Sequence, residues 1–369
     1  MINKQKTLTL IAGGDVGPII EPVDRLADLV LPVLRQADVR VAQCERTYSE
    51  RGWYQEWQTK PGGKHVRQPL KMASVFQTAG IDVVSMASNH ALDWGYDPLF
   101  DTVDHFRSVG MQVIGAGRNS EEARRPAIVE KNGVKIAILG YCSALRDGQA
   151  AGENKPGIAP MRASTHYNPV DFQPGSPPEI ITVPFEEDII AMQNDIGKAK
   201  AEADAVIVFI HWGICFIPKT IATYQPPVAH AAIDAGADII LGHHAHVPKA
   251  VEVYKGKVCF YSIGNFMTTG GHEQGPLIRW NFFWYQRDPG SLYSFPIHCR
   301  QTILPRVVFS KRGVERVAFL PAYINTLAQP EVLDSNDSRF QEVVQTMEWV
   351  SDFTPHKFRI DGNEVVVEV

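Results

Sequence analysis

Short apolar runs alternate with helical patterns along most of this chain. The runs are of strand length and rich in β-branched residues, and they lie at residues 7–12, 39–44, 81–87, 112–114, 127–129, 134–139, 205–210 and 239–241. The segments between them carry apolar residues at helical spacing, at residues 22–36, 69–80, 98–109, 185–203 and 225–235. Buried strands that alternate with helices are typical of parallel sheets with helices packed on them, so the pattern predicts a layered α/β fold.

Two regions depart from this alternation. Residues 146–184 are rich in proline and glycine and show little periodicity, which predicts a long loop or a lid, because structureless loops of this length are usually functional or disordered. Later segments read as hairpins at residues 251–261 and 303–320, and the aromatic block at 280–285 is either a core strand or a pocket wall. We therefore expect one domain over residues 1–327 and a C-terminal appendage, a polar helix and a strand, over 328–369.

Several of the predicted strands end in polar residues that can bind metals. These residues are Asp15, Glu45, Asn89, His90, His211, His243, His244 and His246. Because the carboxyl ends of parallel strands lie at one edge of a sheet, the side chains should converge there. Each has an ordinary alternative, since Asp15 could cap the following helix and a single histidine is more often part of a solvated loop. The three histidines at 243–246 together favour a metal site.

Carboxylates, an amide oxygen and imidazoles together suit divalent ions of intermediate hardness, such as manganese, zinc or iron. Two such ions about 3.5–4 Å apart would generate a hydroxide nucleophile and hold the leaving oxygen. The sequence therefore predicts one or two divalent metal ions as cofactors.

Composition narrows the class of protein. The chain has 369 residues, a hydrophobic share of 44%, a charged share of 21% and a net charge of −5, values typical of a globular protein. It has no basic run, which argues against nucleic acid as a partner. Its five scattered cysteines indicate reduced thiols, and residues 1–12 contain neither a signal peptide nor a membrane span, so we expect a cytoplasmic protein without a membrane partner.

The order of these motifs resembles the calcineurin-like metallophosphoesterase superfamily, and within it the CapA family, named for poly-γ-glutamate capsule synthesis. The segments that carry the resemblance are residues 14–15, Glu45, 87–95, 115–118, 211–213, 235–247, 261–266 and 319–321, and together they span about residues 7 to 325. The resemblance implies an α/β/β/α sandwich of the metallophosphoesterase type.

The resemblance also implies roles for individual residues. The metal ligands would be Asp15, Glu45, Asn89, His211, His244 and His246, and the catalytic pair would be His90 and Asp93. His90 would protonate the leaving group or position the scissile bond, and Asp93 would orient His90. Residues expected near the substrate are Arg67, Arg118, Trp212, Cys215 and His243, and Arg67 could hold an anionic group.

The sequence departs from the family pattern at three places. Gly17 stands where many metallophosphoesterases have a histidine, so the first metal could be weakly held. The pattern Asn-Leu-Glu is here Gln43-Cys44-Glu45, and Cys215 stands where CapA-like proteins tend to have glutamate. Cys215 could be a ligand or a reactive thiol, although an inert apolar thiol is the more ordinary interpretation. The aromatic residues Trp53, Tyr54 and Trp57 could wall a pocket or simply pack on the surface.

These observations favour a soluble metal-dependent hydrolase that uses an activated water on an ester or amide bond. The substrate would be a phosphoester or a small organic or peptide-like molecule, and the chain could form a homo-oligomer. Two alternatives remain: a non-hydrolytic accessory protein of poly-γ-glutamate or related peptide-polymer synthesis, and a metal-binding module without catalysis.

Overall fold

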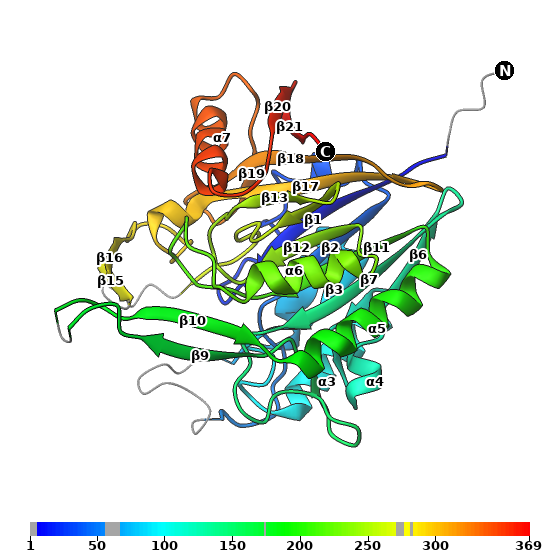
Figure 1. The fold of residues 1–369 in the computed structure, drawn as a ribbon. Helices are drawn as coiled ribbons and strands as arrows, with labels where there is room; N and C mark the ends of the chain where they lie inside the picture. The colour runs from blue at the N-terminus through cyan, green and yellow to red at the C-terminus, as the bar shows by residue number, and fades with distance from the viewer. Residues whose placement is uncertain (1–5, 56–66, 173–174, 271–276, 281–282) are drawn as a thin grey trace.

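The fold was obtained as a computed structural model, which describes residues 6–55, 67–172, 175–270, 277–280 and 283–369. Two large sheets pack against each other (Figure 1). The first sheet has the order β20-β21-β18-β17-β1-β2-β3-β4, and β19 pairs with β18. Its strands are β1 (Leu8–Val16), β2 (Val39–Cys44), β3 (Val83–Ser85), β4 (Gln112–Ile114), β17 (Gln301–Ser310), β18 (Gly313–Ile324), β19 (Pro330–Val332), β20 (Phe358–Asp361) and β21 (Glu364–Val367). Strands β1 to β4 are parallel, and β17 runs antiparallel to β1.

The second sheet has the order β13-β14-β12-β11-β7-β6. Its strands are β6 (Ala127–Lys131), β7 (Val134–Cys142), β11 (Ala205–His211), β12 (Ile239–His243), β13 (Val251–Tyr254) and β14 (Lys257–Phe260). The four central strands are parallel, and β6 and β13 run antiparallel at the edges. Every residue of β11 is buried, as expected for a parallel strand covered on both faces.

Helices cover the outer face of each sheet. On the first sheet lie α2 (Ser74–Thr78) and α3 (Tyr96–Ser108), and α3 buries Leu99, Val103 and Phe106 at helical spacing. On the second sheet lie α5 (Glu186–Glu202) and α6 (Gln225–Asp234), and α5 buries Met192 and Ile196. A third apolar cluster fills the space between the sheets. The predicted α/β/β/α sandwich is therefore confirmed.

The C-terminal segment, predicted as an appendage over residues 328–369, is part of this sandwich. Strand β21 pairs with β18, and helix α7 (Ser338–Ser351) buries Phe340, Val343 and Met347 in the apolar cluster between the sheets. The apolar cluster between the sheets thus includes residues of both the first strand and the last.

Two other predictions need correction. The helix predicted over residues 22–36 is a series of turns at 24–30 followed by the single turn of α1 (Leu31–Leu34). The predicted loop at 146–184 contains β8 (Gly157–Ile158), which pairs with β5 (Ala116–Gly117), and a hairpin of β9 (Ala163–Asn168) and β10 (Glu179–Pro184) that projects from the body (Figure 1). That this segment closes over the site stays a prediction.

The remaining elements are short. The helices are α4 (Ser120–Ala123), η2 (Leu70–Ala73) and η3 (Ile297–Arg300). The described residues of the aromatic block, 280 and 283–285, lie in β15 (Leu277–Trp280) and β16 (Phe283–Gln286), which pair with each other. Trp57 lies outside the described residues. No helix in the described part of the chain is both long and apolar enough to cross a membrane.

Candidate metal centre

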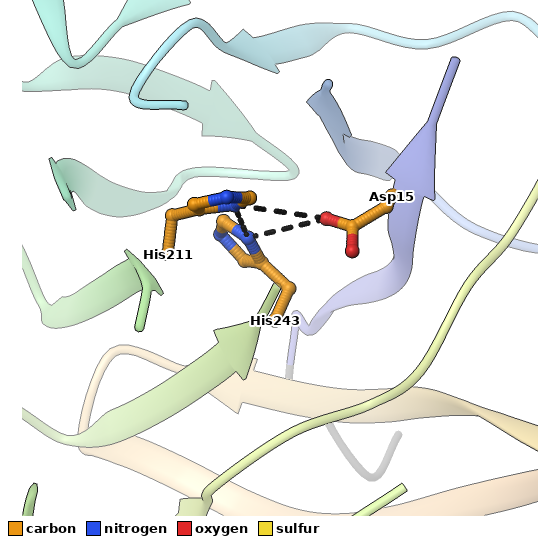
Figure 2. Close-up of side chains that lie close together, drawn as sticks. All are labelled: Asp15, His211 and His243. Atoms are coloured by element: carbon orange, nitrogen blue, oxygen red, sulfur yellow. Dashed lines mark hydrogen bonds and ion pairs between the residues drawn. The ribbon is translucent and has the colours of Figure 1, made fainter. Parts of the chain in front are cut away.

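The two sheets bring the predicted residues together at the carboxyl ends of their central strands. In the first sheet, Asp15 lies near the end of β1 and Glu45 directly follows β2. In the second, His211 ends β11 and His243 ends β12, and these residues are paired in register. Figure 2 shows Asp15 reaching from β1 towards the imidazoles of His211 and His243. The site therefore lies between the sheets, with carboxylates supplied by one and imidazoles by the other.

Three buried side chains form the first cluster of candidate ligands. The Oδ1 of Asp15 lies 3.5 Å from Nδ1 of His243 and 3.7 Å from Nδ1 of His211, and the two imidazole nitrogens are 2.8 Å apart. These three atoms can face one common point. His243, expected from the sequence to lie near the substrate, is one of the candidate ligands of this cluster.

A second cluster shares His211 with the first. It joins Glu45, His211 and His244, and Nε2 of His211 lies 3.7 Å from Oε2 of Glu45. The same Nε2 lies 2.6 Å from Oδ1 of Asn89. His211 thus belongs to both clusters: its Nδ1 faces the first cluster and its Nε2 faces the second.

Several observations show that the residues fit a divalent cation. Among the described residues, Oδ1 of Asp15, Nε2 of His243 and Nδ1 of His244 are buried without a hydrogen-bond partner, which is rare in native structures. Tetrahedral coordination with bonds of about 2.0–2.1 Å places ligand atoms about 3.3 Å apart, close to the separations in the first cluster. A cation at the common point of the first cluster would satisfy Oδ1 of Asp15, whereas the unpaired Nε2 of His243 is not the nitrogen that lies in that cluster.

The electrostatics of the two carboxylates agree with this. Burial, reinforced by the neighbouring Asp15, raises the pKa of Glu45 well above its usual value. Burial also acts to raise the pKa of Asp15, but the imidazoles of His243, His246 and His244 outweigh it and lower the pKa. Burial lowers the pKa of His244 to about 3, so this ring is neutral and available as a ligand at neutral pH. The raised pKa of Glu45 means that burial and Asp15 outweigh the nearby positive charge of Arg46, so a cation bound beside Glu45 would stabilise its ionised form.

The turn after β12 has an unusual backbone conformation. His244 and His246 have φ angles of 86° and 59°, a region that residues other than glycine seldom adopt. The backbone N–H of His244 donates to Oδ2 of Asp15 at 3.2 Å, and Nδ1 of His246 lies 2.8 Å from Oδ1 of Asn265. Strained conformations persist where surrounding contacts hold them, and they cluster at functional sites. The sequence did not predict a role for Asn265. The one feature that could have indicated it is its position directly after Gly264, in the loop that follows β14.

At Gly17, where a metal-binding histidine would be expected, the neighbouring residues leave little space. A Cβ atom there would lie 3.0 Å from Nε of Arg46 and 3.1 Å from Cβ of Glu45. Arg46 received no role from the sequence, yet its positive charge acts to lower the pKa of Glu45. A guanidinium therefore lies beside Glu45, where the resemblance would suggest an imidazole.

His90 and Asp93 form a tight pair beside the clusters. Nδ1 of His90 lies 2.7 Å from Oδ2 of Asp93, and Nε2 of His90 lies 3.9 Å from Oε1 of Glu45. Arg146 donates to the other oxygen of Asp93 at 3.0 Å. Asp93 is 2% exposed, so its orientation of His90 is well defined. Arg146 could not be found from the sequence, because it begins the proline-rich segment far along the chain.

The residues predicted near the substrate lie in different surroundings. Trp212 is fully buried and donates to the Tyr261 carbonyl at 2.9 Å, so it belongs to the core beneath the site. Arg118 is exposed, with its guanidinium over the Phe100 ring and 3.6 Å from Asp104.

Cys215 and Arg67 lie closer to the predicted site residues. The Sγ of Cys215 is 3.3 Å from Nε2 of His244, which places a thiol beside a candidate ligand. The guanidinium of Arg67 lies over the ring of Trp94, and Trp94 directly follows Asp93 in the chain. Binding of substrate by Cys215 or Arg67 stays a prediction.

Fold and site together define a class: an α/β/β/α sandwich with a buried cluster of carboxylates and imidazoles suited to divalent metals. The sequence pattern of the family described as bacterial capsule synthesis protein PGA_cap matches residues 10–269. The chain belongs to this family.

Curated relatives agree with this placement. The PGA biosynthesis protein CapA of Bacillus subtilis (strain 168) is 32% identical over 249 residues, which cover 67% of this chain and 58% of the relative. The capsule biosynthesis protein CapA of Bacillus anthracis is 33% identical over 209 residues, 56% of this chain and 45% of the relative. A probable polyglutamine synthesis accessory protein of Mycobacterium tuberculosis is 32% identical over 199 residues, 52% of this chain and 47% of the relative. The chain thus spans about half the length of the curated relatives it matches.

Among solved structures, the calcineurin-like phosphoesterase YfkN from Bacillus subtilis is similar, with 15% identity and a TM-score of 0.38 over 94% of this chain and 99% of that chain. Similarity at this level carries no argument about activity.

Proposed function

We propose that this protein is a metal-dependent hydrolase that acts on an ester or amide bond. The observation that carries the proposal is the pair of buried clusters, Asp15–His211–His243 and Glu45–His211–His244, beside the His90–Asp93 pair. Among the described residues, Oδ1 of Asp15 is buried without a hydrogen-bond partner, which costs about 1–3 kcal/mol of stability unless a cation binds it.

In this proposal, a cation would be held in one of the two clusters that share His211. The ligands would be Asp15, His211 and His243 in the first cluster, or Glu45, Asn89, His211 and His244 in the second. A divalent cation bound there supplies Lewis acidity and an activated water. Nδ1–H of His90 can donate a hydrogen bond to Asp93, which leaves Nε2 facing Glu45 and the cluster. In its imidazolium form, His90 can deliver the Nε2 proton to a leaving group and become neutral, and Arg146 holds the Asp93 carboxylate in place.

A second candidate function has its own support. One relative is described as a probable polyglutamine synthesis accessory protein, and two others are named for PGA or capsule biosynthesis. We therefore also propose an accessory role in the synthesis of a peptide-like polymer, in which the metal centre would bind the polymer without cleaving it. The two candidates differ in turnover, and both need the metal.

The experiment that separates them is metal analysis combined with a hydrolysis screen of phosphomonoester, phosphodiester, carboxylic ester and amide substrates. For a hydrolase, we expect bound metal and turnover that a chelator abolishes. His211→Ala should lose both, whereas His166→Ala, on the exposed β9–β10 hairpin, should lose neither. Bound metal without turnover on any substrate would favour the accessory role, and metal content unchanged in His211→Ala would refute the metal centre itself.

A further inference from the structure

Arg46 is a cation without a partner at the edge of the metal centre. It directly follows Glu45, at the carboxyl end of β2. Among the described residues, its guanidinium makes no ion pair, and its Nε is buried without a hydrogen-bond acceptor, which is rare in native structures. The side chain is half-buried, and of its three nitrogens only Nε is fully enclosed, so the two terminal nitrogens are open to solvent.

The missing side chain at Gly17 makes room for this guanidinium. A Cβ atom at residue 17 would lie 3.0 Å from Nε of Arg46 and 3.1 Å from Cβ of Glu45, so both side chains lie over the backbone of Gly17. Gly17 comes two residues after Asp15, where the N–H of Glu45 donates to the Val16 carbonyl at 2.9 Å. Asp15 and Glu45 belong to the two clusters of candidate ligands, so the guanidinium lies at the strand ends that carry both.

The charge of Arg46 acts on both sides of the site from this position. Burial raises the pKa of Glu45, and the guanidinium acts against that rise. Burial lowers the pKa of His246, and the guanidinium is among the charges that lower it further. Glu45 follows a strand of the first sheet, and His246 lies in the turn after β12 of the second. Arg46 is therefore within electrostatic reach of the residues that the two sheets contribute.

The charges at these strand ends determine what the guanidinium can bind. Glu45 and Asp15 are the carboxylates there, and both are candidate ligands of a cation. A carboxylate that binds a cation has little negative charge left for a neighbouring arginine, so a bound cation and Arg46 would present two positive charges side by side. An arginine fork and a divalent cation both suit the oxygens of phosphate and carboxylate groups, whereas an uncharged ligand would leave the guanidinium unpaired.

We propose that Arg46 is an anion-binding residue, whose terminal nitrogens bind the oxygens of a phosphate or carboxylate group while a cation is held in the cluster beside it. What this says about the substrate rests on the proposed hydrolase: the substrate carries such an anionic group close to the bond that is cleaved. Anion binding itself does not depend on hydrolysis.

The test measures binding of three small aromatic probes to the zinc-loaded protein by ligand-observed NMR titration. Phenylphosphonate and benzoate carry the two kinds of anionic group, and benzamide is an uncharged probe of similar shape. We expect the wild-type protein to bind at least one anion more tightly than benzamide, and the tighter anion identifies the group. A chelator should weaken anion binding, because carboxylates without a cation attract the guanidinium and repel the anion.

Three variants make the test specific. Arg46→Gln should weaken anion binding about tenfold or more and leave benzamide unaffected, because a charged hydrogen bond is lost. Its zinc affinity should equal or exceed that of the wild-type protein, because a positive charge beside the cation is removed. Arg46→Lys keeps the charge without the fork and should retain part of the anion affinity. Arg35→Gln, at an exposed arginine shortly before β2, is the matched control, and thermal melting verifies that each variant is folded.

The outcomes are distinct from those of the hydrolysis screen. Equal anion affinity in the wild-type protein and folded Arg46→Gln would overturn the proposal, because the cation alone would then bind the anion. Zinc content that falls in Arg46→Gln would also overturn it, since Arg46 would then support the metal ligands instead of the anion. Absent turnover together with anion binding that depends on Arg46 would refute the hydrolase and leave the anion site standing.

Discussion

Lys249 offers a sharp test of how this fold holds the segment that follows Cys215. The side chain is fully buried, and its Nζ donates to the carbonyls of Ile217, at 2.6 Å, and of Thr220. These carbonyls follow Cys215, whose thiol contacts His244. Burial lowers the pKa of Lys249 from 10.5 to about 7. The perturbation we consider is Lys249→Met, which keeps the apolar stem and removes the amine.

The magnitude follows from proton linkage. Below pH 7 the lysine is protonated in both the folded and the unfolded state, so it adds no pH dependence. Between about pH 7 and pH 10.5 the unfolded state binds a proton that the folded state lacks, so the stability of the wild-type protein rises with pH. At about 1.4 kcal/mol per pH unit, the full difference is about 5 kcal/mol, of which about 2–3 kcal/mol develops between pH 6 and pH 9.

The assay is urea unfolding of the wild-type protein and of Lys249→Met across that pH range, with the free energy of unfolding compared at each pH. The wild-type protein should gain about 2–3 kcal/mol over the variant as the pH rises. Lys198→Met, at an exposed lysine on α5, is the control and should follow the wild type. Parallel pH profiles for the wild-type protein and Lys249→Met would refute the reasoning, because they would mean that the buried amine has a normal pKa.

Three further predictions concern the core and the site. Gly14→Ala should destabilise the protein by about 2–3 kcal/mol or more, because the added Cβ would lie 1.9 Å from a backbone oxygen. Gly197→Ala, where the added Cβ would meet open space on a helix, should stabilise the protein by up to about 1 kcal/mol, and thermal melting compares the two variants. Met347→Ala should cost about 2–5 kcal/mol in urea unfolding, and a smaller loss would mean that α7 is a loosely attached appendage. Asp93→Asn should lower turnover about 10–100-fold through the orientation of His90 while metal content stays unchanged, and equal activity would exclude the pair from the reaction.

The pattern of apolar residues predicted the central strands of this fold well, but it predicted the segment at 22–36 and the packing of the C-terminal helix poorly. Fully buried strands such as β11 can be predicted because an apolar run of that length, bounded by polar residues, is seldom anything other than a buried strand. The helix at 22–36 failed because Pro32 lacks the N–H that a continuous helix needs, so the helical turn starts next to it. Helix α7 carries an amphipathic pattern, but the sequence does not say which surface its apolar face packs on. That surface, between β13 and β18, is assembled from strands distant in sequence.

The sequence could predict that the site residues lie close together, because they follow predicted strands, but it could not predict the contacts among them. Strand ends meet whatever the details of the turns, so Asp15 and His211 were expected to be close. Both His243 and His246 lie close to Asp15, with Nδ1 atoms 3.5 Å from Oδ1 and 3.4 Å from Oδ2, and this arrangement depends on the turn, where His244 and His246 have positive φ. Neither Arg146 nor Asn265 could be assigned, because each acts through a contact formed only in the folded protein.

The position of His211 limits how the two clusters can share cations. Its Nδ1 faces Asp15 and His243, and its Nε2 faces Glu45 and Asn89. A neutral imidazole carries one N–H and one lone pair, so it can ligate a cation through only one of these nitrogens. If His211 binds a cation beside Glu45, a cation beside Asp15 must be held without it, and the absence of a ligand at Gly17 removes another candidate. The arrangement therefore favours one firmly held cation over two equivalent ones.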